Sequence, residues 1–196
     1  MIDTKPAHII VRVQPDGSLL KDRSGNTAYA LVDFELLERT PEQLEAVYAE
    51  VLETLMPDLG NEDPGKRSGP QGTLERIAFR AGRPGAEAER VACSKVIAAK
   101  LGRAVEPLGR LWLLKQLERI GRGEAVPAIA QLLGDQDVHV RESARRALQK
   151  NPDPAANTAL QQALAAAHTP AWRAALMNAL AERNAPVNLT LLLNGA

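Results

Sequence analysis

EAVPAIAQLLGDQDVHVRESARRALQKNPDPAANTALQQALAAAHTPAWRAALMNALAER (residues 124–183) nearly repeats itself, and this repetition decides the fold. Arg141 and Leu148 recur as Arg173 and Leu180, with the same offset of 32 residues. Each copy contains an amphipathic segment rich in Ala and Leu, a short break, and a second such segment. A period of this length built from two helices is typical of stacked helical hairpins. The sequence therefore predicts a mainly α protein, an α-solenoid.

The same pattern extends upstream in weaker form. Arg110 and Leu117 precede Arg141 and Leu148 by 31 residues, so we expect the stack to occupy residues 86–196. Before it, residues 40–85 predict a degenerate helical pair. Its first helix opens at Thr40-Pro41 and its second at Thr73, because Thr is a good N-cap and Pro suits the first helical position.

A long loop is expected to separate these two helices. Residues 57–72 contain seven Pro or Gly in sixteen positions. Both residue types disfavour regular helix, and they are common in turns. The stretch therefore predicts an exposed connection between the two helices.

Residues 1–39 form the third predicted part. Apolar residues alternate with others near residues 8–13 and 30–36, a period of two that is typical of strands. Turn residues and a short return segment at 18–22 lie between them. The expectation is a small antiparallel β-meander, and the alternative is a helix over residues 28–39.

Composition agrees with a helical fold and bounds the function. Hydrophobic residues make up 45% of the chain and aromatic residues only 3%, so the core must consist of small aliphatic side chains. The net charge is zero, divided as −4 over residues 1–84 and +4 over residues 85–196. This surplus is small for a dedicated nucleic-acid binder. Nucleic acid is therefore a disfavoured partner.

Cysteine usage and hydropathy point to the cytoplasm. The single cysteine, Cys93, cannot form an internal disulfide, which fits a reducing compartment. The N-terminus lacks the charged and apolar regions of a secretory signal. No apolar run approaches the roughly 20 residues that span a bilayer, so no membrane partner is expected.

Residues 124–149 resemble a HEAT repeat, and the variety to which they are most similar is the bacterial, phycobilisome-lyase-type HEAT-like repeat. The resemblance continues over residues 154–184, is looser over residues 86–121, and covers about residues 86–194 in all. It implies a right-handed superhelical stack that mainly binds other proteins. It says little about catalysis.

The resemblance also implies roles for Asp137 and Arg141. In such repeats an Asp in the turn and an Arg at the start of the second helix bond along the stack. Arg110, Arg141 and Arg173 would then form a ladder that ties neighbouring repeats together. The alternative role of this ladder is contact with an anionic partner.

A search for chemistry finds no catalytic constellation. His8, His139 and His168 lie in unlike contexts, and none has a second ligand at metal-binding spacing. Cys93 lies on a predicted helix without a nearby His, which favours a buried thiol over a nucleophile. The prediction is a protein without catalytic residues, metal or cofactor.

The candidate binding residues lie on the second helices of the repeats, which line the concave face in HEAT arrays. A solvated, partly salt-bridged face is the competing interpretation. The expected partner is another protein, and an acidic segment would fit the arginines; the acidic predicted helix at residues 41–56 could itself occupy the groove. The predicted partner-binding residues are Arg110, Arg141, Arg145, Arg146, Arg173 and Trp172.

The C-terminal residues suggest an oligomer contact. Leu189, Leu191, Leu192 and Leu193 follow the last predicted repeat without a partner helix behind them. They either fold back on that repeat or meet another chain. A homo-oligomer, or a subunit of a larger complex, is the resulting expectation.

Three functions are compatible with these observations. The favoured one is a non-enzymatic scaffold or assembly subunit that binds a partner protein on the concave face. A DNA-binding or base-excision HEAT-like protein is the first alternative. A chromophore-lyase-like protein is the second alternative, and it rests on the repeat resemblance alone.

Overall fold

The computed structural model describes residues 9–11, 29–31, 40–102 and 106–184. The chain divides into two compact units, Met1–Thr40 and Pro41–Ala196, and each is described by itself.

The first unit contains a short antiparallel pair of strands. Strand β1 (Ile9–Val11) pairs with β2 (Tyr29–Leu31), with Ile10 opposite Ala30. A meander would pair the first strand with the second, but here the first predicted strand pairs with the third. The expected β-meander is therefore not confirmed, because alternation identifies a strand without identifying its neighbour. The segment at residues 18–22 lies outside the described residues.

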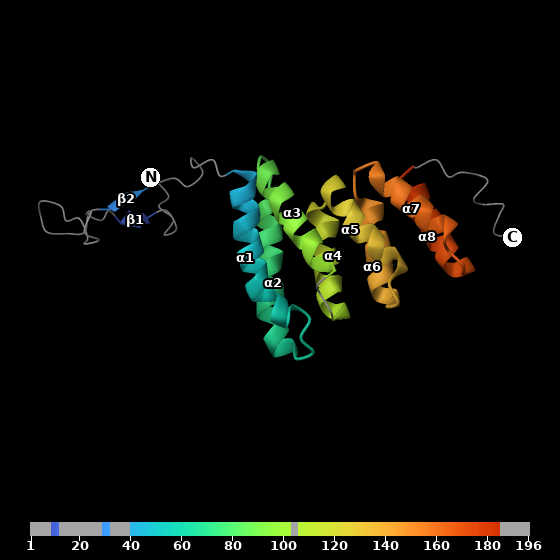
Figure 1. The fold of residues 1–196 in the computed structure, drawn as a ribbon, viewed down its shortest axis with the longest axis horizontal. Coiled ribbons are helices and arrows are strands. Elements are labelled where there is room, and N and C mark those ends of the chain that lie inside the picture. Colours follow the sequence, from blue (N-terminus) through green and yellow to red (C-terminus); the bar gives the residue numbers. More distant parts are fainter. Residues whose placement is uncertain (1–8, 12–28, 32–39, 103–105, 185–196) are drawn as a thin grey trace, which may run out of the picture. The chain divides into compact units, whose positions relative to one another are not determined.

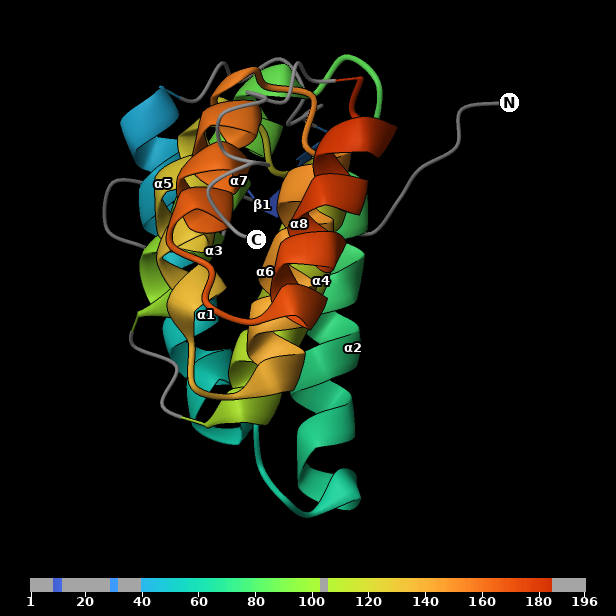
Figure 2. The same cartoon turned by 90° about the vertical axis from the view of Figure 1, so that its right-hand side faces the viewer.

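The second unit is a stack of helical hairpins (Figure 1). Each hairpin contributes one helix to each of two layers, and consecutive helices within a layer pack on one another. Figure 2 looks along the stack and shows α1, α3, α5 and α7 on one side and α2, α4, α6 and α8 on the other. The helices are α1 (Pro41–Leu59), α2 (Pro64–Ala81), α3 (Glu87–Leu101), α4 (Pro107–Ile120), α5 (Val126–Gln131), α6 (Val138–Lys150), α7 (Ala155–Ala165) and α8 (Pro170–Glu182).

Two short 3-10 segments flank α5, namely η3 (Gly123–Ala125) and η4 (Leu132–Gly134). Helix α5 itself has only six residues. The first helix of the third hairpin is therefore a short α-helix extended by 3-10 turns at both ends.

Caps and prolines define where the second-layer helices begin. Asp137 accepts hydrogen bonds from the backbone N–H groups of His139 and Val140 at the start of α6. Thr169 accepts from the N–H of Trp172 at the start of α8, which has Pro170 in its first turn. Such caps satisfy N–H groups that have no partner inside the helix. These caps fix the starts of α6 and α8.

The core is a continuous aliphatic layer between the two rows of helices. The repeated leucines, Leu148 and Leu180, are both fully buried, as is Leu117 to within 1%. Alanines fill many of the remaining inward positions, so the helices approach closely. The other fully buried leucines and isoleucines include Leu52, Leu59, Leu74, Ile97, Leu101, Leu113, Leu114, Ile129, Leu160, Leu164 and Leu176.

The connection expected at residues 57–72 is wrong. Helix α1 runs through Pro57 to Leu59, and α2 begins at Pro64 with Asp63 as its N-cap, so Thr73 lies inside α2. Pro64 at the first helical position costs little because its missing N–H would be unpaired there anyway. Composition alone misjudged this stretch, since tertiary contacts override helix propensity.

Two side-chain bonds show what holds α2 in place. Gln71 Nε2 donates to the carbonyl of Leu59 at the end of α1, over 3.0 Å. Trp112 Nε1, on α4, donates to the carbonyl of Gln71, also over 3.0 Å. Helix α2 is therefore tied to both α1 and α4, and the first hairpin joins the stack without a long loop.

Helix α1 does not occupy a groove among the second-layer helices. It lies in the first layer and packs against α3, where Glu45 pairs with Lys95 over 2.8 Å and Glu53 pairs with Lys100. The hypothesis of an acidic helix bound to the arginines is therefore wrong. Its charge is instead matched by lysines on the neighbouring first-layer helix.

Polar side chains also tie consecutive second-layer helices at their C-terminal ends. Asn151, only 2% exposed, donates to the carbonyls of Gly121 and Arg122 over 3.2 and 3.1 Å. At the equivalent position 32 residues later, Arg183 donates to carbonyls at the end of α6. These bonds satisfy carbonyl groups that a helix end leaves without partners.

Within the described part of the chain, no helix is both long enough and apolar enough to cross a membrane.

Candidate partner-binding cleft

The predicted arginines lie on the second-layer helices, but they do not form one shared basic surface. Arg110 lies on α4, Arg141, Arg145 and Arg146 lie on α6, and Arg173 lies on α8. Their partners differ from one helix to the next. The bonding partners of each arginine show which arginines hold the stack together and which one borders a cleft.

Arg110 ties α4 to the next hairpin. Its Nη1 lies 2.5 Å from Oδ2 of Asp135, whose side chain is 8% exposed. Asp135 Oδ1 accepts in turn from the N–H of Asp137 over 2.9 Å. The bond along the stack is therefore made by Asp135, whereas Asp137 caps α6; the ladder predicted with Asp137 needs this correction.

Arg145 is neutralised within its own helix. Its Nε lies 3.0 Å from both carboxylate oxygens of Glu142, and its Nη1 donates to Gln149. The hydrogen bond from Arg145 lowers the pKa of Glu142 below its usual value. Arg145 is thus part of a bonded set along α6.

Arg146 pairs with the preceding second-layer helix. Its Nη2 lies 3.5 Å from a carboxylate oxygen of Glu118 on α4, and Lys150 lies 2.5 Å from the same carboxylate. Between the two preceding second-layer helices, Arg119 of α4 bonds Glu75 of α2 over 2.7 Å. Acid–base pairs therefore run along this layer, and they reduce its attraction for anions.

Arg141 has a different environment. Its Nη1 donates to the carbonyl of Asp135 over 3.0 Å, and its guanidinium carbon lies 5.3 Å from the ring centroid of Trp172 on α8. This is the geometry of a cation–π contact. Among the described residues, no carboxylate lies within ion-pair distance of Arg141.

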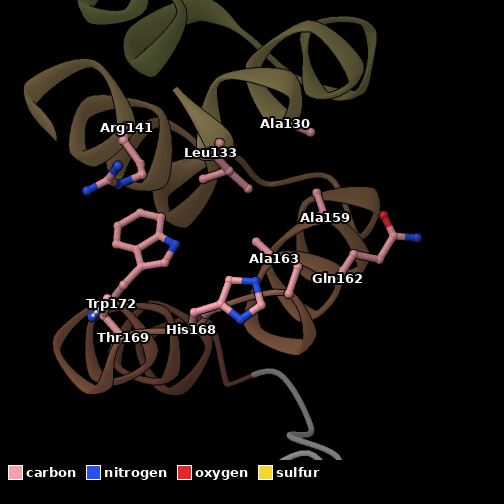
Figure 3. Close-up of a pocket in the computed structure, with 12 residues that line it drawn as sticks. Ala130, Leu133, Arg141, Ala159, Gln162, Ala163, His168, Thr169 and Trp172 are labelled. Carbon is pink, nitrogen blue, oxygen red and sulfur yellow. Dashed lines mark hydrogen bonds between the residues drawn. The ribbon is translucent and has the colours of Figure 1, made fainter. Parts of the chain in front are cut away.

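Arg141 and Trp172 border a cleft of about 410 Å³ between the third and fourth hairpins (Figure 3). Its volume falls within the range of about 300–1,000 Å³ that is typical of ligand pockets. Its walls come from α5 and η4, from the start of α6, from α7, and from the turn into α8. The lining residues are Ala130, Leu133, Gly134, Arg141, Ala159, Gln162, Ala163, Ala166, Ala167, His168, Thr169 and Trp172.

The cleft exists because small residues face each other across the two hairpins. Ala159 and Ala163 lie one turn apart on α7, Ala166 caps its C-terminus, and Ala130 lies opposite on α5. Leucines at these positions would fill the space, as they do elsewhere in the core. The small side chains on this face of α7 therefore leave the cleft open.

Polar groups lie around this apolar floor. In Figure 3, Trp172 lies below Arg141 on one side, His168 extends from the turn, and Gln162 lies at the opposite edge. Arg141 and His168 are the two basic side chains of the lining, which contains no carboxylate. The arrangement can therefore accommodate an apolar group beside a negative one.

The other predicted site residues lie elsewhere. Arg173 donates to the carbonyl of Leu164 at the end of α7, with a donor–acceptor distance of 3.5 Å. The predicted oligomer contact, Leu189, Leu191, Leu192 and Leu193, lies outside the described residues. Of the predicted partner-binding residues, the structure thus brings together Arg141 and Trp172 at the cleft.

Of the lining residues, the sequence predicts only Arg141 and Trp172; Gln162, Ala163 and His168 are among those it does not predict. The available signal was the run of alanines at helical spacing in α7, which indicates a face too small to fill its surroundings. His168 was considered only as a metal ligand, and its place at the edge of a cleft could not be read from spacing.

The described residues show no built site for metal or thiol chemistry. No group of three or more potential metal ligands occurs among them. Cys93 is fully buried, and burial raises the pKa of its thiol to about 12. A protonated, inaccessible thiol is a poor nucleophile.

Comparison with known families agrees with the geometry. Residues 95–190 match the family described as HEAT repeats. This segment of the chain is similar to HEAT repeats. The match begins within α3 and includes the hairpins on both sides of the cleft. A comparison with curated proteins gives no significant match.

Proposed function

We propose that this HEAT-repeat protein is a non-enzymatic scaffold that binds a segment of another protein in the cleft between its third and fourth hairpins. The observation that carries the proposal is the cleft itself. It joins an apolar floor to the Arg141–Trp172 pair. HEAT repeats commonly serve as protein-interaction scaffolds, which supports the same reading.

The proposed binding face is smaller than the face that the sequence predicts. Arg141 and Trp172 are retained as partner-binding residues. Arg110, Arg145 and Arg173 are assigned structural roles, because each bonds a carboxylate or a carbonyl of the stack and none of them lines the cleft. Arg146 is half-exposed and pairs loosely with Glu118, so it is a peripheral contact at most.

The alternatives have less support. A DNA-binding surface needs unpaired cations along a face, whereas acids neutralise Arg119, Arg145 and Arg146. No described feature favours a chromophore-lyase-like role. A homo-oligomer through the C-terminal leucines stays a prediction. Light scattering of the unmodified protein and of Leu192→Glu tests it. The variant should have a lower mass if the leucines hold the oligomer together.

Affinity capture from a native cell extract tests the proposed function. Three baits are compared: the unmodified protein, Ala163→Leu, and Ala165→Leu as a matched control. Ala163 lines the cleft, whereas Ala165 is exposed on the same helix and does not line it. The substitution at 163 fills the cleft without removing any polar contact.

The expected result is a protein retained by the unmodified bait and by Ala165→Leu but lost from Ala163→Leu. Equal recovery by all three baits would place the interface elsewhere. Recovery of nucleic acid in place of protein would contradict the scaffold function.

A further inference from the structure

The cleft combines two features that select for a particular chemistry. Its floor is apolar, formed by Leu133, Ala159 and Ala163 among others, and Trp172 forms one wall. Its basic side chains, Arg141 and His168, have no acidic counterpart in the lining. A ligand that fills the apolar floor without contacting Arg141 would desolvate its guanidinium without offering it an opposite charge.

We propose that the cleft binds a short acidic peptide segment of the partner, in which a bulky apolar side chain enters the hollow and a neighbouring carboxylate pairs with Arg141. This inference rests on the proposed scaffold function, and it specifies the partner's chemistry. The occupant is an Asp- or Glu-containing segment with at least one Leu, Ile, Met or Phe.

The apolar half of this chemistry follows from the walls. Small alanine side chains on α5 and α7 leave space that water fills at a cost, since they offer it few hydrogen bonds. Burying one large aliphatic or aromatic side chain there removes apolar surface from water on both sides. The indole of Trp172 adds a rigid, flat contact surface, as aromatic residues commonly do at interfaces.

The preference for a carboxylate in the bound peptide follows from the unused donors of Arg141. Within the described residues, its only side-chain hydrogen bond is from Nη1 to the carbonyl of Asp135, and its buried Nε has no partner. Guanidinium groups bind carboxylates through two parallel hydrogen bonds. The Trp172 ring contacts the guanidinium, which restricts its orientation in advance and lowers the entropy cost of binding.

Neighbouring groups reinforce the preference for an anion. The N-terminus of α8 lies in the wall at Thr169 and carries the positive end of the helix dipole. The nearby acids are already engaged: Asp135 bonds Arg110, Glu142 bonds Arg145, and Asp137 caps α6. None of these carboxylates lines the cleft.

Selection from a display library of short random peptides tests this inference. The library is selected on the unmodified protein after depletion on Ala163→Leu, so that only cleft-dependent binders remain. We expect the enriched pool to combine acidic residues with large apolar ones. A pool that depends on the cleft but is basic, or lacks either feature, would overturn the inference and leave the scaffold function standing.

The absence of any cleft-dependent enrichment would count against both this inference and the proposed function. A variant that merely fails to fold is recognised by its far-UV circular dichroism. Ala165→Leu serves as the folded control, and it should bind the enriched peptides as tightly as the unmodified protein does.

A double-mutant cycle then tests the pairing itself. The tightest selected peptide and its Asp→Asn or Glu→Gln version are titrated against the unmodified protein and Arg141→Gln by fluorescence anisotropy. Each single change should weaken binding by about tenfold, the usual size for a charge-assisted hydrogen bond. The double change should weaken it little further. Independent, multiplicative losses would exclude a direct contact between the carboxylate and Arg141.

Discussion

Arg183 closes the end of α6. It donates to the carbonyls of Leu148, Gln149 and Asp153 over 2.8, 3.0 and 2.9 Å, and also to that of Asn151. Burial lowers the pKa of Arg183 below its usual value. One residue therefore satisfies most of the carbonyl groups at a turn between repeats.

Replacing Arg183 with Met should destabilise the array strongly. The carbonyls of Gln149 and Asn151 would lose this donor while remaining partly buried, and a buried polar group without a partner costs about 1–3 kcal/mol. Urea unfolding followed by circular dichroism measures the loss. Arg146→Met is the control, with an expected change below about 0.5 kcal/mol, because exposed ion pairs contribute little. Equal effects of the two substitutions would show that the carbonyl network is not important for stability.

Cys93 predicts how stability depends on alkaline pH. Burial raises the pKa of its thiol from 9.0 to about 12, so the thiol ionises more readily in the unfolded chain. The free energy of unfolding should therefore be unaffected by this group below pH 9 and should fall between pH 9 and about pH 12. The slope per group approaches about 1.4 kcal/mol per pH unit.

Burial of Tyr48 acts in the same direction, because it too raises a pKa above the ordinary value, which is 10.0 for the phenol. Denaturant unfolding of the unmodified protein and Cys93→Ala over this pH range isolates the thiol. The alanine variant should lose less stability as the pH rises. Parallel curves for the two proteins would mean that Cys93 is accessible to solvent.

At the scale of elements, α2 differs most from expectation. It contains Gly65, Gly69, Pro70 and Gly72, a composition that predicts a loop, yet it forms an 18-residue helix. Its apolar residues supply the reason, since Leu74 and Ala78 are fully buried against the stack. Helix propensity is a weak preference that packing of an apolar face overrides.

Opposite substitutions at Gly72 test whether α2 is a helix. A Cβ added there meets nothing within 4 Å. Gly72→Ala should therefore raise the free energy of unfolding by about 1 kcal/mol, and Gly72→Pro should lower it by about 3 kcal/mol. In an exposed loop both changes would be small. Thermal unfolding followed by circular dichroism distinguishes the two cases.

The well-patterned helices could be predicted closely. The repeated pairs Arg141–Leu148 and Arg173–Leu180 lie within α6 (Val138–Lys150) and α8 (Pro170–Glu182). Their caps and apolar spacing both point to the same boundaries. The errors occurred where local signals conflict with packing, as in α2, or where a strand's partner is not encoded locally, as for β1.

The charge pairs along α2, α4 and α6 predict the behaviour of the molecule toward DNA. Because Glu75 and Glu118 neutralise cations of the next helix, the layer lacks a continuous basic stripe. Fluorescent duplex DNA should show no specific, salt-sensitive binding in anisotropy titrations at low and high salt. A steep loss of affinity with added salt would reveal phosphate contacts and contradict this view.

The candidate site could be predicted only in part. Arg141 and Trp172 were identified because the repeat pattern places them on second helices. Their contact across two hairpins, and the hollow beside Ala163, depend on the distance between repeats and on side-chain sizes in three dimensions. The same limit explains why the sequence predicts Arg145 and Arg110 as partner-binding residues, since only the folded chain shows which acids pair with them.

Site-specific photo-crosslinking tests the central claim, that partners bind in the cleft, most directly. A benzophenone side chain is introduced at Gln162, on the rim of the cleft, or at Asn178, which is exposed on α8 and does not line it. After irradiation in a native extract, we predict a crosslinked partner from position 162 that disappears when Ala163→Leu is added, and none from position 178. Crosslinking at 178 but not at 162, or crosslinking at 162 that persists in the filled variant, would contradict the account.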